Sequence, residues 1–344
     1  MSEARDLHLV VPGLLGPVPD PDAVRRLVGD LPGLGHLLTR AQRQPVASHG
    51  DEAAVFRAFG VDGPPWPVAA VTRAGEADGL APGQRHWLRA DPVHLRVDMT
   101  QARLFGDCAL ALEADEARAL VETLNAHFAQ DGLQFEAPAP GRWYLSSDTP
   151  AAFEAYTPME VAGRNVQLFL PRGDDAPRWR TRLTEIQMLF HDAGVNRARE
   201  RAGRLPVNSV WPWGGGAAPA VRAFEGQVVA DDPLARGLAA LAGMHVQPLP
   251  GDAAALALPR GTTVAVESGV REPLVHGEIE AWMEALGRLE SRWFRPLLPR
   301  LRAGELRSLV IDPAGPVRYR VTRRTLRRFW RTSRPWTAHV EQGS

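Results

Sequence analysis

The sequence contains no lysine: all forty of its basic residues are arginine, and forty acidic residues balance them to a net charge of zero. Without lysine the chain cannot form a Schiff base with a carbonyl substrate, supply the lysine of a GK[ST] phosphate-binding loop, or use a lysine general base. A GC-rich genome that favours arginine codons explains the absence without giving it a function.

Cysteine is almost as scarce, and long apolar runs are missing. The single Cys108 supports no intrachain disulfide and, within DCALAL, is typical of a small core residue. No run approaches the roughly 18 apolar residues that a membrane span needs. The N-terminus, MSEARDLHLVVPGLLG, carries charges of both signs and suits a buried strand better than a signal peptide. We therefore expect a cytoplasmic protein that does not enter a membrane.

The two flanks of the chain have the texture of an α/β protein. A chain of 344 residues with 44% apolar residues can bury a sizeable core. LHLVV at 7–11 reads as a strand, and helical spacing follows over 22–41. Similar strand and helix patterns alternate after residue 171, which is typical of a largely parallel sheet flanked by helices.

The middle of the chain has a different texture. Residues 86–105 read as strands, 113–132 as an amphipathic helix, and 133–147 as two strands joined by a turn. The preceding segment, 60–84, is rich in proline and glycine around a VAAV run that we predict to be a buried strand. The sequence thus predicts a core built from 1–85 and 171–344 and an inserted α+β domain over 86–170.

The most unusual stretch is LPVNSVWPWGGG, residues 205–216, which looks too irregular for an ordinary strand or helix. Glycines allow the backbone to approach a ligand or a neighbouring element closely, and Trp211 and Trp213 can either line a pocket or pack beneath it. A purely structural corner is the alternative. Asn208 fits that alternative least, because its amide can face a ligand.

The helical segment before this stretch, 179–203, is broken near Gly194 and carries further polar residues. Guanidinium forks and amide donors suit phosphate oxygens. We therefore consider a phosphate site, although polar residues scattered along a helix surface give the same pattern. The candidate ligand-binding residues are Asn196, Arg197, Asn208, Trp211, Trp213 and Gly214.

Two other patterns suggest binding chemistry. In REPLVHGEIEAW, Glu272 and His276 are four residues apart, so on a helix they would face one side and could ligate a divalent metal. The alternative is an acidic first helical turn, with Pro273 weakening the case for a regular helix. The C-terminal RYRVTRRTLRRFWRTSRPW carries eight arginines between 318 and 334. Such a segment can bind nucleic acid, acidic lipid or an acidic protein, or form an amphipathic helix with a solvated face.

Several segments together resemble the archaeal-type cofactor-independent phosphoglycerate mutases. HDAGVNRARERAGRLPVNSVWPWGGGAAP is similar to the helix and "pAN.iWlWGqG..p" motif of that family. LARGLAALAGMHVQPLPG is similar to its "ikGig...Gm.v..vpG" segment, and EADEARALVETLNAHF followed by LQFEAPAPGRWYL is similar to its insert. The matches cover most of the chain in order. They imply an alkaline-phosphatase-like α/β core, with a largely parallel sheet flanked by helices and interrupted by a smaller α+β domain.

The catalytic positions of that family are not kept. Its metal-binding Asp-Gly corresponds to Pro12-Gly13, and its phosphoryl-accepting "TPnLD.La" motif to LPGLGHLL, which has Leu31 at the nucleophile and Gly35 at the aspartate. Its "DeagH" ligands appear as Glu272 and His276. Its "DHsTP" motif appears as IDPAGP, which keeps Asp312 and replaces the histidine with Pro313. Because the family needs two metals to activate a hydroxyl, the resemblance implies that this chemistry is lost.

A degenerate mutase of this length, without lysine and rich in tryptophan, is similar to bacterial proteins called regulatory protein of the RpfE type. We therefore expect a non-catalytic pseudoenzyme with a regulatory role that needs no cofactor and binds a phosphorylated small molecule or a protein partner. The alternative is a Mn-, Zn- or Mg-dependent phosphoglycerate mutase or phosphatase that uses Glu272, His276 and Asp312 as residual ligands. A third hypothesis is nucleic-acid binding by the arginine-rich segment.

Overall fold

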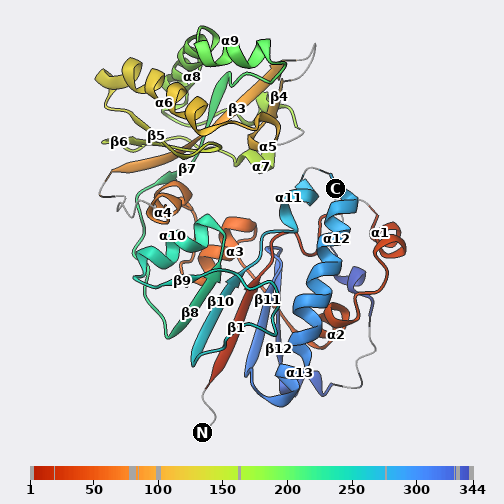
Figure 1. The fold of residues 1–344 in the computed structure, drawn as a ribbon. Coiled ribbons are helices and arrows are strands. Elements are labelled where there is room, and N and C mark those ends of the chain that lie inside the picture. Colours follow the sequence, from red (N-terminus) through yellow and green to blue (C-terminus); the bar gives the residue numbers. More distant parts are fainter. Residues whose placement is uncertain are drawn as a thin grey trace. The chain divides into compact units, whose positions relative to one another are not determined.

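The chain folds into two compact units (Figure 1). The core unit comprises Met1–Pro64 and Ala220–Ser344, and the inserted unit comprises Pro65–Pro219. The computed structural model describes residues 4–18, 20–76, 83, 85–97, 102–161, 164–275, 277–328, 330 and 334–340. The side chain of Cys108 and the whole of His276 and Phe329 lie outside these described residues.

A seven-stranded sheet forms the centre of the core unit, in the order β2-β12-β11-β1-β10-β8-β9. The strands from β11 to β9 are parallel, and β12 and β2 extend one edge in antiparallel pairing. Leu9 of β1 pairs with Ala265 of β10 and with Ile311 of β11. The strands are β1 (Arg5–Val10), β2 (Gln42–Pro45), β8 (Gly226–Ala230), β9 (Val246–Gln247), β10 (Gly261–Val266), β11 (Ser308–Asp312) and β12 (Val317–Thr322).

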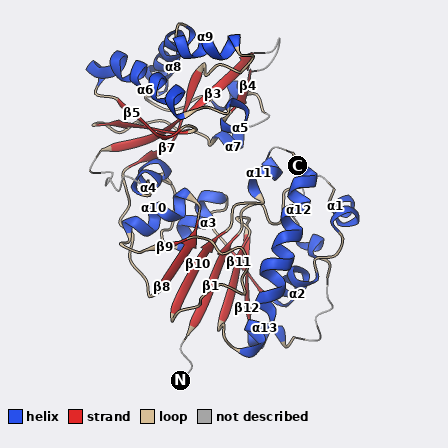
Figure 2. Cartoon of the chain, in the orientation of Figure 1, coloured by secondary structure: helices blue, strands red, loops and turns tan. Residues whose placement is uncertain are grey.

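Helices flank this sheet (Figure 2). Alternate residues of a strand point to opposite faces. Leu7 and Leu9 therefore join one apolar cluster with Leu34 of α2 and Trp282 of α12, whereas His8 points to the other face. The helices are α1 (Pro21–Val28), α2 (Pro32–Arg40), α3 (Asp51–Ala58), α10 (Pro233–Leu241), α11 (Arg271–Val275), α12 (Ile279–Leu289), α13 (Arg295–Ala303) and α14 (Arg323–Leu326), with a π-helical turn at Glu290–Phe294.

The inserted unit is an antiparallel sheet with helices on both faces. Its order is β4-β3-β6-β5, and β7 also pairs with β3. On one face α6 and α8 bury Phe128 and Phe190 against Trp143, and on the other α4 packs on Trp87 and Tyr144. The elements are α4 (Val68–Ala74), β3 (His86–Val97), β4 (Ala102–Phe105), α5 (Asp107–Leu110), α6 (Ala114–Phe128), β5 (Gln134–Ala139), β6 (Arg142–Ser147), α7 (Pro158–Val161), α8 (Ala176–His191), α9 (Gly194–Arg201) and β7 (Ser209–Gly216).

The predicted α/β class is confirmed, with its largely parallel sheet, flanking helices and a smaller α+β unit. The observed inserted unit is wider than the predicted 86–170. It gains α8, α9 and β7 because β7 pairs with β3 through Trp211 and Asp91. It also gains α4, because the VAAV run predicted to be a strand is a helix that packs on the sheet of this unit.

The LPVNSVWPWGGG stretch forms strand β7 over Ser209–Gly216, contrary to the expectation that it is no strand, and its register with β3 shifts near the glycines. Its glycines allow α4 to approach β7. Gly214 has φ +62°, and a Cβ there would lie 3.0 Å from Cβ of Val68. Gly216 has φ +148°, and a Cβ there would lie 2.8 Å from Cβ of Pro67. The large and small residues stand together because the tryptophans fill the core while the glycines leave room for a helix.

The arginine-rich C-terminal segment is not one amphipathic helix. Its first part is β12, which pairs with both β11 and β2, and among the described residues the four residues of α14 and a 3₁₀ turn at Trp336–His339 follow. The strand alternates arginines with Tyr319 and Val321, which are buried. Arg318 and Arg320 therefore lie on a strand and Arg323 and Arg324 on a short helix, whereas Arg327, Arg328 and Arg334 lie outside both elements and Arg331 lies outside the described residues.

Candidate functional site

The N-terminus of α2 is where the resemblance aligns the phosphoryl acceptor. Leu31 precedes the helix, is 5% exposed and packs in the core. The amides of Gly33 and Leu34 donate to the two carboxylate oxygens of Glu290, at 2.7 and 2.9 Å. A helix N-terminus attracts anions through such amides. Here a buried carboxylate of the protein itself fills that position.

The neighbouring positions of the family pattern are also packed. A Cβ at Gly33 would lie 2.9 Å from Oε1 of Glu290, so a glycine is required for the carboxylate to approach. A Cβ at Gly35 would lie 3.4 Å from the carbonyl oxygen of Arg334. The carbonyl of Gly13 accepts a hydrogen bond from the Trp282 indole at 3.1 Å. These positions therefore hold core contacts.

Asp312, at the carboxyl end of β11, is fully buried. Its Oδ2 accepts from Nε and Nη2 of Arg57 at 3.2 and 2.9 Å, and its Oδ1 accepts from the amide of Ala314 at 3.1 Å. His8 Nε2 lies 3.7 Å from the same Oδ2. Burial tends to raise the pKa of Asp312, but His8 and Arg57 outweigh it and hold the pKa of this carboxyl below its usual range. Both oxygens of Asp312 thus already have partners.

The described members of the predicted metal-ligand set, Glu272 and Asp312, do not form a site for a divalent ion. Glu272 is exposed on the short helix α11, and His276 lies outside the described residues. The carboxylate of Asp312 would have to leave Arg57 before it could ligate. Within the part of the chain that the structure describes, no three His, Cys, Asp or Glu side chains are grouped to hold a metal.

Two acidic groups that the sequence interpretation missed lie near the carboxyl ends of β8 and β10. Asp232 caps α10 through the amide of Ala235 and accepts from Oγ of Ser268 at 3.3 Å. Burial raises the pKa of Asp232. Asp51 forms an ion pair with Arg271. Asp232 followed by a proline is a sequence signal for a helix cap. An ion pair between residues far apart in the chain, such as Asp51 and Arg271, leaves no local sequence signal.

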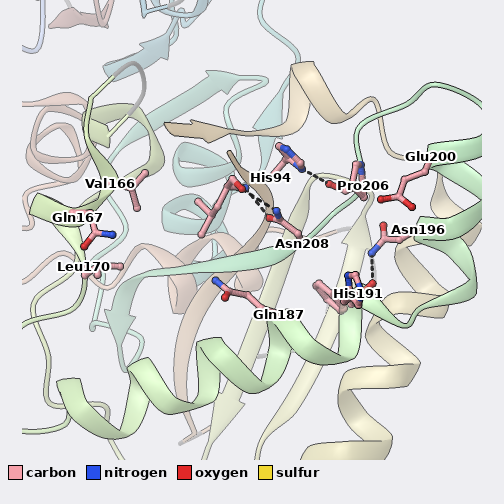
Figure 3. Close-up of a pocket in the computed structure, with 12 residues that line it drawn as sticks. His94, Val166, Gln167, Leu170, Gln187, His191, Asn196, Glu200, Pro206 and Asn208 are labelled. Atoms are coloured by element: carbon pink, nitrogen blue, oxygen red, sulfur yellow. Dashed lines mark hydrogen bonds between the residues drawn. The ribbon is translucent and has the colours of Figure 1, made fainter. Parts of the chain in front are cut away.

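The inserted unit contains a pocket of about 580 Å³ (Figure 3). This volume lies within the range of about 300 to 1,000 Å³ of small-molecule sites. Helices α8 and α9, the end of β3 and the segments around Val166 and Pro206 form it. Its apolar wall consists of Leu95, Val166, Leu170, Phe190 and Pro206, and its polar side chains are His94, Gln167, Gln187, His191 and Glu200, joined by Asn196 and Asn208.

His94 has a defined orientation in this pocket. Its Nδ1 lies 2.8 Å from the carbonyl oxygen of Pro206 (Figure 3). A carbonyl can only accept, so Nδ1 carries a proton, and Nε2 of the neutral ring is an acceptor. No side-chain hydrogen bond joins Gln167, Gln187 or His191 to any residue that the structure describes, so these groups can bind a ligand.

Both predicted asparagines line this pocket, but their amides serve the backbone. Asn208 bonds to the amide and carbonyl of Leu95 at 2.7 and 2.9 Å. Asn196 donates to the carbonyls of Phe190 and Val207, both at 2.7 Å, and accepts from the amide of Val207. They hold the strand and helix ends that shape the pocket.

The other predicted ligand-binding residues lie elsewhere in the inserted unit. Arg197 is exposed on α9 and does not line the pocket. The Trp211 indole donates to the carbonyl of Tyr156, and the Trp213 indole donates to Asp91, both at 2.7 Å. Gly214 packs on α4. The six candidates therefore do not form one cluster, and only the asparagines share a cavity.

Comparison with known proteins gives a consistent but distant relationship. No family model matches the chain. The 2,3-bisphosphoglycerate-independent phosphoglycerate mutases of Methanosarcina acetivorans and Methanosarcina mazei are 25% and 26% identical to it, over 78% and 74% of this chain and 72% of each relative. That of Methanothrix thermoacetophila is 30% identical over 39% of this chain and 32% of its own.

One solved structure with a TM-score above 0.5 supports the fold. The PH0037 protein of Pyrococcus horikoshii aligns over 94% of this chain and 88% of its own, at 12% identity and a TM-score of 0.56. The cofactor-independent phosphoglycerate mutase of Thermoplasma acidophilum aligns over 93% and 90%, at 16% identity and a TM-score of 0.42. The chain is thus phosphoglycerate-mutase-like in sequence. No helix among its described residues is long and apolar enough to cross a membrane.

Proposed function

We propose that this phosphoglycerate-mutase-like protein is a pseudoenzyme that binds a phosphorylated small molecule or a protein partner in a regulatory role. The observation that carries the proposal is the buried contact between Glu290 and the first amides of α2. Leu31 stands beside it where a phosphoryl acceptor is expected, and its side chain has no nucleophilic atom.

The Glu290 contact opposes phosphate binding at this helix in two ways. Its carboxylate uses the amides that an anion would use, and its negative charge repels a second anion. Asp312 adds to the argument, because Arg57 holds it in a buried ion pair rather than leaves it open to a metal. Removing one partner from a buried ion pair is costly, so a metal would have to offset that cost.

The pocket of the inserted unit is the ligand site that we propose. The amide groups of Gln167 and Gln187 and the imidazole of His191 can donate to ligand oxygens. The apolar wall that includes Phe190 would cover the rest of a small molecule. We also propose that the protein is bacterial and cytoplasmic. The first rests on the resemblance to RpfE-type proteins, and the second on the scarcity of cysteine.

The catalytic alternative makes a separate prediction. A Mn-, Zn- or Mg-dependent mutase or phosphatase would release phosphate or exchange 2- and 3-phosphoglycerate, and His276→Ala would abolish that rate. His245→Ala is the matched control, because His245 is an exposed histidine of the same unit. Under our proposal, the parent protein, His276→Ala and His245→Ala all show no metal-dependent rate of phosphate release or phosphoglycerate exchange. A rate lost in His276→Ala but kept in His245→Ala would refute it.

Binding is tested on the full chain by calorimetry with a panel of phosphorylated metabolites and by pull-down of protein partners. Gln187→Ala should weaken a pocket ligand by about two- to tenfold, the value of one hydrogen bond. Gln130→Ala, an exposed glutamine outside the pocket, should leave the affinity unchanged. The proposal fails if no metabolite or partner binds at micromolar concentrations.

A further inference from the structure

A second, smaller pocket of about 180 Å³ lies in the core unit, where β10 ends. Glu267, Gly269 and Val270 of the loop after β10 form one side of it. The facing side comes from α12 and the π-helical turn, and the segment after β9 closes a third side. Ligands of open α/β sheets characteristically bind outside the carboxyl ends of the parallel strands, which is where this pocket lies.

Glu267 is the chemically unusual group of this pocket. Its Oε1 accepts from the amide of Gly269 at 3.1 Å. Its Oε2 is buried and has no hydrogen-bond partner among the residues that the structure describes. Burial raises the pKa of Glu267, and the nearby Arg288 only partly opposes that effect. A buried carboxylate oxygen without a donor is unfavourable, so a rotation of the Glu267 side chain that turns Oε2 toward a cationic donor in the pocket would be favourable.

Two arginines line the same pocket from the helix side. Arg288 and Arg292 are separated by about one helical turn, so they approach the pocket from one helix face. Arg288 makes a 3.6 Å ion pair with Glu284 in which both side chains are more than half exposed. Such a pair is weak. The pocket is therefore lined by an acidic residue on one side and by two basic residues on another.

The size and the remaining wall limit the ligand further. Its volume of about 180 Å³ lies below the range of about 300 to 1,000 Å³ of small-molecule sites, so it suits a small ligand. Between the charged groups the wall is apolar, with Val270, Leu289 and Trp293. A ligand of this pocket is thus small, carries both charges and has an apolar part.

We infer that this pocket binds a small free α-amino acid, with its ammonium group at Glu267, its carboxylate at Arg288 and Arg292, and its apolar side chain against Leu289 and Trp293. The inference does not depend on the proposed function, because it uses a different pocket. It does not require a catalytic step.

The test is calorimetric titration of the full chain with L-alanine and L-valine and with two analogues that each lack one charge. Ethylamine lacks the carboxylate of alanine, and propionate lacks its ammonium group. We expect the amino acids to bind and each analogue to bind at least about tenfold more weakly, because each leaves one charged side of the pocket unpaired. Equal binding of L-alanine and both analogues would overturn the inference.

Substitutions of pocket residues test whether the amino acid binds in this pocket. Glu267→Gln and Arg292→Gln should each weaken L-valine by at least about tenfold. Arg292 is exposed, so its variant should fold normally even if Glu267→Gln does not. Glu225→Gln, in an exposed ion pair with Arg260, is the matched control and should bind as the parent does. The inference is wrong if no amino acid binds at millimolar concentration, if inorganic phosphate binds instead, or if Arg292→Gln leaves the affinity unchanged.

Discussion

Replacement of Glu290 by alanine should destabilise the core unit strongly. Glu290 is 3% exposed and joins the π-helical turn to the N-terminus of α2, more than 250 residues away in sequence. Its carboxylate satisfies the amides of Gly33 and Leu34. It also accepts from Nε of Arg295 at 2.9 Å, but that guanidinium is largely exposed, so this pair should contribute little.

The magnitude follows from the two amides. A buried donor left without an acceptor costs about 1–3 kcal/mol, so two of them cost about 2–6 kcal/mol. The small cavity left by the shortened side chain adds to this loss. Against a total stability of about 5–15 kcal/mol, the loss is a large fraction. Glu290→Gln should lose about half as much, because it keeps one acceptor oxygen but turns an NH₂ group toward the second amide.

Urea unfolding gives the free-energy change, and hydrogen exchange at Gly33 and Leu34 reports the local effect. Glu284→Ala, an exposed glutamate of the same helical segment, should change stability by less than about 0.5 kcal/mol. Formate should restore part of the stability of Glu290→Ala, by about 2.7 kcal/mol at 100 times its dissociation constant. If the alanine variant lost less than about 1 kcal/mol and both amides stayed protected, the assignment of Glu290 as the partner of α2 would be refuted.

Three further predictions concern other sites. Asp312→Asn should lower the free energy of unfolding by about 3–5 kcal/mol at pH 7, because it breaks a buried ion pair. Since the folded pKa of Asp312 is lowered, the difference in stability between parent and variant should shrink as the pH falls from the unfolded pKa of about 3.9 through the folded value. Urea unfolding at each pH measures this difference. Gly216→Ala should cost about 1–3 kcal/mol in thermal unfolding because of its positive φ and its close contact, whereas Gly287→Ala, on an open helix surface, should be neutral or stabilising. Burial and nearby arginines lower the pKa of His339 to about 4, so stability present above the unfolded pKa of about 6.5 should fall as the pH drops toward 4. Solvent screening of this partly exposed ring limits the loss to about 1–2 kcal/mol, and His339→Gln should remove it. An unchanged acid profile in Asp312→Asn or His339→Gln, or an unchanged melting temperature in Gly216→Ala, would contradict the corresponding assignment.

The parts of the fold that sequence predicted well are those with strong local patterns. The apolar run at 7–11 overlaps β1, and the amphipathic segment at 113–132 contains α6. The prediction of a strand at VAAV was wrong, because a short apolar run fits a buried strand and a buried helix equally well. Only the packing of α4 against β7 and β3 distinguishes the two.

The domain bounds and the candidate site depended on contacts that leave no local pattern. The pairing of Trp211 with Asp91 assigns β7 to the inserted unit, and it links residues 120 positions apart. Asn196 and Asn208 were read as ligand donors because their type suits phosphate, yet both amides are used by backbone groups. Residue type suggests what a side chain is able to bind, whereas only tertiary contacts decide what it does bind.

The core unit differs from an open catalytic centre in how its buried acids are satisfied. The carboxylate of Glu290 has helix amides, and that of Asp312 has a guanidinium and an amide, so a metal would have to displace these partners. Glu267 is the exception, since within the described chain its Oε2 is the only carboxylate oxygen that is buried without a partner. If the protein binds a cationic ligand at this oxygen, the ligand would remove the cost of an unsatisfied buried acceptor. Ligand searches should therefore include small cations and zwitterions, which a screen restricted to phosphorylated compounds would miss.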